Sequence, residues 1–150
     1  MTATPSANSD SRLLPVHRRV EHADTDASGV MHFARYPVLL ETALLANLER
    51  LGAGLAVLAR DGLDLVVTEV RTQYRSPARY PDELVLAPTV GHLGAARARI
   101  DTTIRRRNED TELATGSLLI AVTDRATGAP CALHPALHAI LEESRSDARR

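Results

Sequence analysis

The clearest pattern along the chain is an alternation of hydrophobic and polar residues over 96–106. Strict alternation predicts a strand with one buried and one solvent-exposed face. Three further extended runs, rich in Val, Leu and Thr, predict strands over 63–75, 83–92 and 112–124. A weaker alternation predicts a short strand over 15–23, before a stretch that is dense in turn-forming residues.

A different spacing predicts a helix over 37–51. Pro37 suits the first helical turn, and Gly52 suits the position just past the end. Leucines recur along one side and the other sides are largely apolar too, which is typical of a buried helix. Shorter helices are predicted over 55–60 and 135–143.

The order of these elements predicts an α+β fold. One strand and a buried helix precede four long strands, and short connections favour antiparallel pairing. Pro88 lies inside one predicted strand, so that strand should be an edge or be bulged there. We expect one domain over 15–143, with a disordered tail over 1–14 and a frayed end over 144–150. An open sheet edge would be closed by pairing with a second copy.

Composition excludes several classes of chemistry. The chain is 44% hydrophobic, which is enough for a packed core. All 18 basic residues are Arg, so Schiff-base chemistry and a P-loop lysine are excluded. The single Cys, Cys131, excludes an internal disulfide and a Cys-rich zinc site. His134 and His138 have the spacing of metal ligands on a helix, but no third ligand is evident, so we expect no metal and no cofactor.

Charge and hydropathy bear on the partners of the protein and on its location in the cell. The net charge of -1 and the 3% aromatic content argue against nucleic-acid binding. The chain shows no apolar leader segment and no apolar run of membrane-spanning length. We therefore expect a soluble, cytoplasmic protein with no membrane span.

The segment from His22 to Glu41 carries the candidate chemistry. Asp24 and Asp26 lie two residues apart in a Gly-containing loop that directly precedes the long helix. Helix N-termini present unpaired N–H groups that can bind the developing oxyanion of an acyl transfer. A carboxylate beside them could act as general base or nucleophile. Asp in such a loop is more often a helix cap or part of an Asx-turn, and that alternative stays open.

This segment resembles a known family. Its loop, Asp-Thr-Asp-Ala-Ser-Gly-Val over 24–30, is followed by Tyr36 and Glu41, and together they resemble the signature of the 4-hydroxybenzoyl-CoA thioesterase-like family. The segments over 67–78 and 112–135 resemble later strands of that family, in the same order. The resemblance covers roughly 15–142. It implies the hotdog fold, in which a curved antiparallel sheet of five to six strands wraps a long central helix.

The resemblance also implies roles for individual residues. Asp26 matches the family's catalytic carboxylate, which attacks the thioester carbonyl or activates a water. The backbone N–H of Phe33 matches the oxyanion donor, and Glu41 is a second candidate for the carboxylate, because a related hotdog lineage uses a helix carboxylate as its base. Supporting positions match as follows: Asp24 shapes the loop, Gly29 lets it pass close to substrate, and Tyr36 lines or supports the pocket.

Two departures from the family pattern affect the site. Some relatives carry His at the position of Phe33, whereas here His32 lies one residue earlier and is expected in the pocket wall. The stretch before Arg97, where some members bind the CoA phosphates, carries little charge. Phosphate or carrier-protein contacts are therefore assigned to arginines on two strands, although a solvated, ion-paired face would give the same pattern. These arginines are Arg71, Arg75, Arg97 and Arg105.

The sequence thus predicts an acyl thioesterase that acts on an acyl-CoA or an acyl-carrier-protein thioester, as a homodimer or a homotetramer. The aliphatic composition hints at a fatty-acyl or polyketide chain. Two alternatives stay open. One is a hotdog hydratase or dehydratase acting on an acyl thioester, and the other is a non-catalytic module that binds acyl chains or scaffolds a complex.

Overall fold

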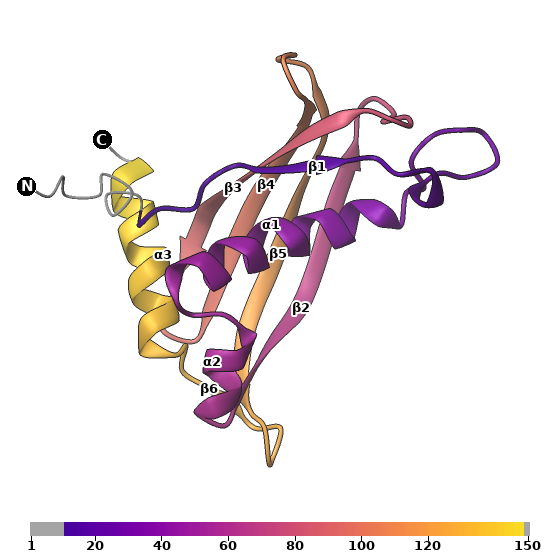
Figure 1. Ribbon diagram of the computed structural model, residues 1–150. Coiled ribbons are helices and arrows are strands. Elements are labelled where there is room, and N and C mark those ends of the chain that lie inside the picture. Colours follow the sequence, from indigo (N-terminus) through magenta and orange to yellow (C-terminus); the bar gives the residue numbers. More distant parts are fainter. Residues whose placement is uncertain (1–10, 149–150) are drawn as a thin grey trace, which may run out of the picture.

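The computed structural model describes residues 11–148. A curved antiparallel sheet is crossed on one face by a long helix, α1, with two smaller helices at its flanks (Figure 1). This is the α+β arrangement expected from the sequence. In chain order, the elements are β1 (Val16–Arg19), η2 (His22–Asp24), α1 (Arg35–Leu51), α2 (Leu55–Arg60), β2 (Leu63–Tyr74), β3 (Glu83–Leu93), β4 (Arg97–Arg106), β5 (Glu112–Asp124), β6 (Pro130–Cys131) and α3 (Pro135–Ala148).

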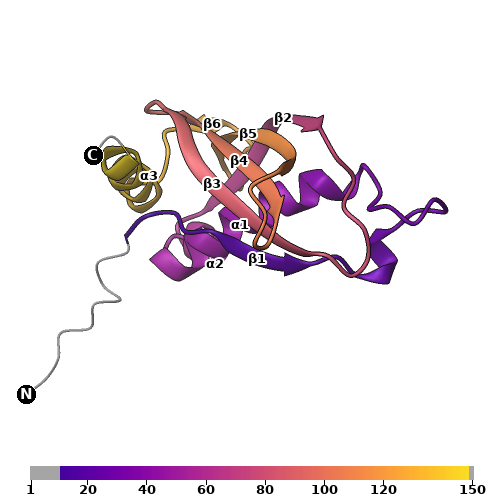
Figure 2. The ribbon, with the colours of Figure 1, turned by 90° about the horizontal axis from the view of Figure 1, so that it is seen from above.

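The strand order within the sheet is β1-β3-β4-β5-β2, and β6 pairs with the far end of β5. All pairs are antiparallel. The strand β2 therefore forms one edge of the sheet, with β5 as its partner. Seen from above, α1 lies under the sheet and α3 stands beside β3 (Figure 2). Among the helices of the described residues, none is long and apolar enough to cross a membrane.

The hydrophobic core lies between α1 and the inner face of the sheet. Leu40, Leu44 and Leu48 of α1 are almost completely buried, as the helical stripe predicts. They meet the buried side of the alternating strand β4 and its neighbours. At Gly116 on β5, a Cβ atom would lie 2.5 Å from Leu40 Cδ1 and 2.8 Å from the carbonyl oxygen of Arg71. The absence of a side chain at this position lets α1 rest directly on β5.

Pro88 lies where β3 has a neighbouring strand on one side only. The strand β1 pairs with β3 over Glu83–Leu86 and ends before Pro88, which pairs with Thr102 of β4. Proline lacks an N–H to donate, so this local edge is a place where it does not break the ladder. A bulge follows at Gly91, between Val90 and His92.

Several boundaries differ from the sequence predictions, for identifiable reasons. The strand β1 ends at Arg19 rather than continuing to 23, because the Glu21 N–H donates to Asp24 Oδ2 and the chain turns into η2. The helix α1 begins at Arg35, before Pro37. The helix α3 ends at Ala148, beyond the predicted helix end at 143.

The expected N-terminal tail falls partly outside the described residues, which begin at 11. Within the described part, Leu13 is buried, and its N–H donates to Ser144 Oγ of α3 at 3.1 Å. The Leu14 N–H donates to Asn47 Oδ1 of α1 at 2.7 Å. These bonds tie residues 13 and 14 to the helices α3 and α1.

Candidate functional site

The loop before α1 forms a small hairpin. Thr25 bridges Met31, and the Asp26 N–H donates to the carbonyl of Val30 at 2.9 Å. Gly29 has a φ of +81°, a left-handed conformation that glycine adopts without strain. The Met31 N–H donates to the carbonyl of Ala78 at 2.7 Å, which fixes the hairpin to the segment after β2. Both views show this loop projecting past the body of the molecule (Figures 1 and 2).

Asp26 is exposed at the start of this turn. Its Oδ1 accepts the Ser28 N–H at 2.8 Å, an Asx-turn contact. Within the described residues, Oδ2 accepts no hydrogen bond. Asp26 therefore does form the Asx-turn that was the alternative to a catalytic role. This turn uses only one of its two carboxylate oxygens. The other oxygen is free to meet a ligand.

Asp24, by contrast, is only 5% exposed. Arg18 and Arg35 lie against its carboxylate at 3.3 Å and 3.6 Å. Its Oδ2 accepts the Glu21 N–H at 2.8 Å, and its carbonyl accepts the N–H of His32 at 2.8 Å. All of these contacts lie within the loop and at its base. Asp24 is thus held in place as the base of the loop and is not available to a ligand.

The backbone at the start of α1 leaves one donor free. The Ala34 N–H donates to His32 Nδ1 at 3.0 Å, and the Arg35 N–H donates to the His32 carbonyl at 2.9 Å. The Tyr36 N–H donates to the Phe33 carbonyl at 3.4 Å. In the part of the chain that the structure describes, the Phe33 N–H has no acceptor. The His32 imidazole therefore accepts the N–H of the N-cap residue, Ala34, and leaves Phe33 as the open donor.

The Phe33 peptide is fixed from the sheet side by Tyr74. The hydroxyl of Tyr74, at the end of β2, donates to the Phe33 carbonyl at 2.9 Å. The Tyr74 ring meets the Tyr36 ring edge to face, with centroids 5.0 Å apart. The Tyr36 hydroxyl accepts the Ala78 N–H at 3.3 Å, and burial raises the pKa of Tyr36. The sequence analysis assigned no role to Tyr74, although it lies in one of the segments that carry the family resemblance.

A hollow of about 260 Å³ lies beside this peptide. Three of the four aromatic residues of the chain line it, together with Arg75. This differs from the aliphatic pocket that composition suggested, because the scarce aromatic side chains gather at this end. The lining residues are Met31, Phe33, Tyr36, Tyr74, Arg75, Ser76 and Pro77.

Glu41, the second candidate for the carboxylate, lies elsewhere on α1. Its side chain is exposed, so its charge carries no burial cost. Along the helix axis it lies about 9 Å from Arg35, at about 1.5 Å per residue. Within one chain, Glu41 therefore lies well along α1 from the contact between Tyr74 and Phe33.

The four candidate arginines do not form one cluster. Arg97 and Arg105 lie at opposite ends of β4, about 26 Å apart at about 3.3 Å per residue. Arg71 pairs with Glu69, and Arg75 pairs with Glu112 at 3.6 Å. No single phosphate could contact all four. Arg75 is the one that lines the hollow beside Phe33.

Of the two histidines that are spaced like metal ligands, His134 and His138, the first contacts other groups of the protein. His134 Nε2 lies 2.6 Å from Asp61 Oδ2, and its Nδ1 accepts the Ala136 N–H. His134 therefore joins the start of α3 to the end of α2. Among residues 11–148, no group of three His, Cys, Asp or Glu side chains is arranged to hold a metal ion.

Both the sequence and the fold of this chain resemble those of known proteins. The sequence pattern of the Thioesterase-like superfamily matches residues 20–141. No curated protein sequence matches the chain. Solved structures do: a DHNA-CoA thioesterase from Staphylococcus aureus shares 20% identity with a TM-score of 0.82, covering 91% of this chain and 93% of that one.

Two further structures are similar. A 1,4-dihydroxy-2-naphthoyl-CoA thioesterase from Synechocystis shares 20% identity with a TM-score of 0.81, over 87% of this chain and 96% of that one. A "Probable Thioesterase from Bartonella henselae" shares 28% identity with a TM-score of 0.73, over 80% of this chain and 98% of that one. These likenesses confirm the expected hotdog fold.

Proposed function

Because the chain belongs to the thioesterase-like superfamily, we propose that it is an acyl thioesterase that uses Asp26 as its catalytic carboxylate. The observation that carries this proposal is the free Phe33 N–H. It is the open donor at the start of α1, it borders the aromatic hollow, and the hairpin bearing Asp26 leads directly into it.

The Phe33 N–H would donate to the thioester carbonyl oxygen and would stabilise the negative charge that develops there. As a general base, Asp26 takes a proton from water, and the resulting hydroxide attacks the carbonyl carbon. The C–S bond then breaks, and the sulfur leaves with the proton that Asp26 returns. As a nucleophile, Asp26 itself attacks, the thiolate leaves, and water hydrolyses the acyl anhydride. A rapid-quench search for acylated Asp26 by mass spectrometry distinguishes the two routes, because only the second forms an anhydride on that side chain.

Substitution of Asp26 tests the assignment. Asp26→Asn and Asp26→Ala should each lose most thiol release while keeping the circular dichroism spectrum and the unfolding temperature. Asp124→Asn is a matched control, because Asp124 also accepts backbone N–H groups in a turn that contains a left-handed glycine, Gly128. Near-normal hydrolysis by both Asp26 variants would reject the assignment. A collapse with Glu41→Ala alone would move the catalytic carboxylate to the helix.

The arm that carries the acyl group is either CoA or the phosphopantetheine of a carrier protein, and we assign its phosphate contact to Arg75. This side chain lines the hollow and is about half exposed. Arg75→Ala should raise the KM for an acyl-CoA or acyl-carrier-protein thioester. It should leave unchanged the KM for an N-acetylcysteamine thioester of the same acyl group, which lacks phosphate. Equal changes in the KM for both kinds of thioester would show that Arg75 does not contact the phosphate.

The acyl group is tested by a thiol-release screen over short, long and aromatic acyl chains on both arms. The ring-lined hollow favours an aromatic acyl group over the fatty-acyl or polyketide chain that composition suggested. If thioesters bind without any thiol release across the panel, the non-catalytic alternative replaces the enzyme. Water addition to an enoyl thioester would instead support the hydratase alternative.

We further propose a homodimer formed across the β2 edge. Val67, Val70 and Tyr74 on this strand are 39%, 45% and 50% exposed, and Val38 of α1 is 46% exposed. A second copy paired on this edge would cover these apolar groups. The hairpin that bears Asp26 projects past the same side of the molecule, where the partner would lie (Figure 1). Val70→Arg should therefore halve the solution mass and lower thiol release together.

A further inference from the structure

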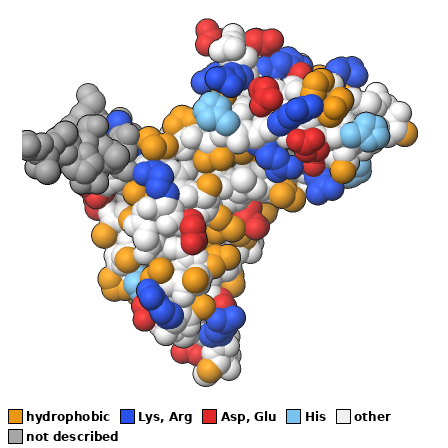
Figure 3. All heavy atoms as spheres, viewed as in Figure 1, with side chains coloured by type: hydrophobic (Ala, Val, Ile, Leu, Met, Phe, Trp, Pro, Cys, Tyr) orange, Lys and Arg blue, Asp and Glu red, His pale blue; other side chains and the backbone are white. Residues whose placement is uncertain are grey.

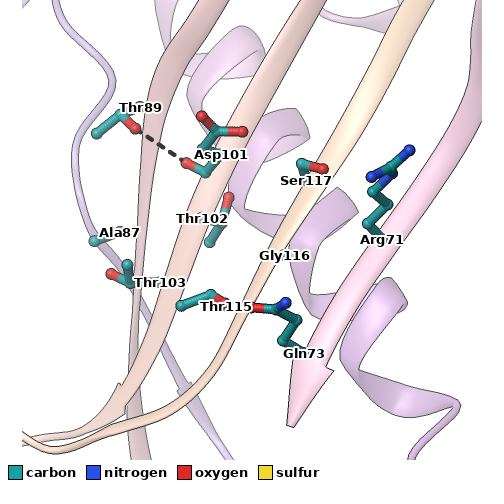
Figure 4. Close-up of a pocket in the computed structure, with 10 residues that line it drawn as sticks. All are labelled: Arg71, Gln73, Ala87, Thr89, Asp101, Thr102, Thr103, Thr115, Gly116 and Ser117. Atoms are coloured by element: carbon teal, nitrogen blue, oxygen red, sulfur yellow. Dashed lines mark hydrogen bonds between the residues drawn. The ribbon is translucent and has the colours of Figure 1, made fainter.

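The hollow that a ligand of the Phe33 N–H enters is the one beside the start of α1. The outer face of the sheet, which points away from α1, has a hollow of about 470 Å³ that is lined by strand residues. Figure 4 shows Arg71, Ser117 and Asp101 side by side on that face, with α1 behind the sheet. The hollow of about 260 Å³ is lined by Phe33 itself. A ligand there lies next to the turn that His32 closes.

The bond between the His32 ring and the Ala34 N–H closes a short turn before α1. It joins the ring of one residue to the N–H of the residue two positions later, at 3.0 Å. The Asx-turn in the same loop has this spacing, since the Ser28 N–H donates to Asp26 Oδ1. The half-buried His32 ring therefore stands where an Asn or Asp side chain is common before a helix.

The peptide groups on the two sides of Phe33 are held differently. The following peptide is held at both ends, because its carbonyl accepts the Tyr74 hydroxyl at 2.9 Å and its N–H, that of Ala34, donates to His32 Nδ1. The preceding peptide is held at its carbonyl, which accepts the Arg35 N–H at 2.9 Å. Its N–H is the open donor. The bond to Nδ1 therefore keeps Ala34 from competing with Phe33 for a ligand oxygen.

The same bond fixes the protonation state of His32. An imidazole nitrogen accepts a hydrogen bond only when it carries no proton, so the proton of the neutral ring lies on Nε2. Imidazoles as a class gain their second proton between about pH 5 and 8. A proton on Nδ1 would place two donors 3.0 Å apart, and the ring would turn away. The Ala34 N–H would then be open beside that of Phe33.

The surroundings of the ring offer no carboxylate to hold that second proton. The charged and titratable groups around His32 and Phe33 are Asp24, Asp26, Arg18, Arg35, Tyr74 and Arg75. The carbonyl of Asp24 accepts the His32 N–H, but its carboxylate lies against the two arginines of the loop and of α1. Among residues 11–148, no carboxylate forms an ion pair with the His32 ring. One face of the ring stacks on Phe33, with centroids 4.5 Å apart.

From these contacts we infer that His32 is the positioning residue of the oxyanion donor, and that its neutral ring makes Phe33, rather than Ala34, the open N–H. The inference rests on the proposed thioesterase activity and adds a requirement that Asp26 does not supply. When His32 is protonated, the thioester oxygen meets two loosely held N–H groups, and the developing charge is stabilised less. Turnover should therefore fall on the acid side of neutrality.

Replacement of His32 by Asn tests this inference. An Asn at this position can accept the Ala34 N–H through Oδ1, as Asp26 does for Ser28, and it gains no proton. His32→Asn should keep most of the kcat of the unaltered chain at pH 8 and should hold it down to pH 5, where carboxylates as a class stay ionised. The unaltered chain should lose about tenfold in kcat over this range, and His32→Ala should be about tenfold lower throughout.

A matched control uses the same bond at another helix. His134 Nδ1 accepts the Ala136 N–H at 3.1 Å at the start of α3, far from the hairpin that bears Asp26 (Figure 1). His134→Asn keeps an acceptor for that N–H, and its profile of kcat against pH should coincide with that of the unaltered chain. Circular dichroism at each pH verifies the fold of every variant.

A second readout does not depend on turnover. In the ¹⁵N-labelled chain, the Ala34 amide resonance should shift between pH 8 and 5, and it should not shift in His32→Asn. An acid loss of kcat that persists in His32→Asn, or an Ala34 resonance that ignores pH, would overturn this inference alone if Asp26 variants still lose thiol release. Absence of thiol release from the unaltered chain would overturn the proposed activity and this inference with it, even where the Ala34 resonance responds.

Discussion

The two ends of helix α1 are stabilised in different ways. At the C-terminal end, Leu48, Ala53 and Leu58 are completely buried, and Gly52 adopts a left-handed φ of +88° that closes the helix. At the N-terminal end, Phe33 is 66% exposed; the Ala34 N–H donates to the His32 ring and the Tyr74 hydroxyl donates to the Phe33 carbonyl. Charged and histidine side chains gather toward that end of the visible surface (Figure 3).

The difference separates stability from function. Apolar burial at the C-terminal end contributes stability in proportion to the area removed from water, and it requires no particular orientation. Hydrogen bonds at the N-terminal end contribute less free energy each but fix the direction of one N–H group. Substitutions at the first end should therefore mainly change the free energy of unfolding. Substitutions at the second should mainly change turnover.

The largest effect is expected from Leu48→Ala, which removes a fully buried side chain at the C-terminal end. The free energy of unfolding should fall by about 2–5 kcal/mol, from lost burial and the cavity left behind. Thiol release per folded molecule at low temperature should stay unchanged. Leu55→Ala is the control, because Leu55 is 48% exposed and its loss should cost under about 0.5 kcal/mol. A large loss of turnover per folded molecule in Leu48→Ala would contradict the distinction between an end that stabilises the fold and an end that serves function.

Asp24→Asn tests whether the functional end also contributes stability. It keeps the shape of a buried side chain but removes its charge opposite Arg18 and Arg35. Because both arginines are partly exposed, we expect a loss of about 2 kcal/mol in chemical denaturation, together with slower turnover from a looser loop. Asp64→Asn removes an exposed pair with Arg125 and should cost under about 0.5 kcal/mol. Identical effects of the two substitutions would contradict the structural role of Asp24.

Tyr74→Phe changes one hydrogen bond and almost no packing. Loss of the hydroxyl that donates to the Phe33 carbonyl should lower kcat about tenfold, equivalent to about 1.4 kcal/mol, because the oxyanion donor is less well fixed. KM and the unfolding temperature should change little. Tyr80→Phe removes an exposed hydroxyl that accepts from Arg19, and kcat should not respond. An unchanged kcat in Tyr74→Phe would show that Phe33 needs no support from the sheet.

The smallest effect is a stability change at high pH. Burial raises the pKa of Tyr36 above its usual 10.0, so the folded chain holds this proton more tightly than the unfolded chain. Its contribution is fully present below the unfolded pKa of about 10 and is lost as pH rises through the folded value. Unfolding temperatures between pH 8 and 11 should therefore fall less in Tyr36→Phe than in the unaltered chain. Parallel curves of unfolding temperature against pH for the two proteins would show that Tyr36 does not cause the loss of stability at high pH.

Much of this fold follows from local pattern. The strand β5 matches its predicted limits, Glu112–Asp124, and α2 matches Leu55–Arg60, because alternation and turn residues mark both ends. The start of α1 could not be read in the same way. A proline at 37 resembles a first helical residue, whereas the His32 side chain accepts the Ala34 N–H and lets the helix begin earlier.

The candidate site also contains some residues that local sequence predicts and others that only the structure reveals. Asp26 and Phe33 are close in sequence, and a resemblance of motif was enough to propose them. The contact of Tyr74 with Phe33 joins residues 41 positions apart and depends on where β2 ends. The alignment of Arg71 with Asp101 on either side of Ser117 depends on the register of β2 and β4 against β5, which a single sequence does not reveal. Relations between distant strands had to come from the structure.

Gly116 limits how this chain can vary. Any side chain there would meet Leu40 and the carbonyl oxygen of Arg71, so a substitution must shift both the Leu40 side chain and the β2 backbone. In a library of all single substitutions, we expect position 116 to accept nothing but glycine, while Thr115 and Ser117, which point to the other face, accept many residues in a folded protein. Such a position keeps the packing of α1 against the sheet constant while the sequence around it varies.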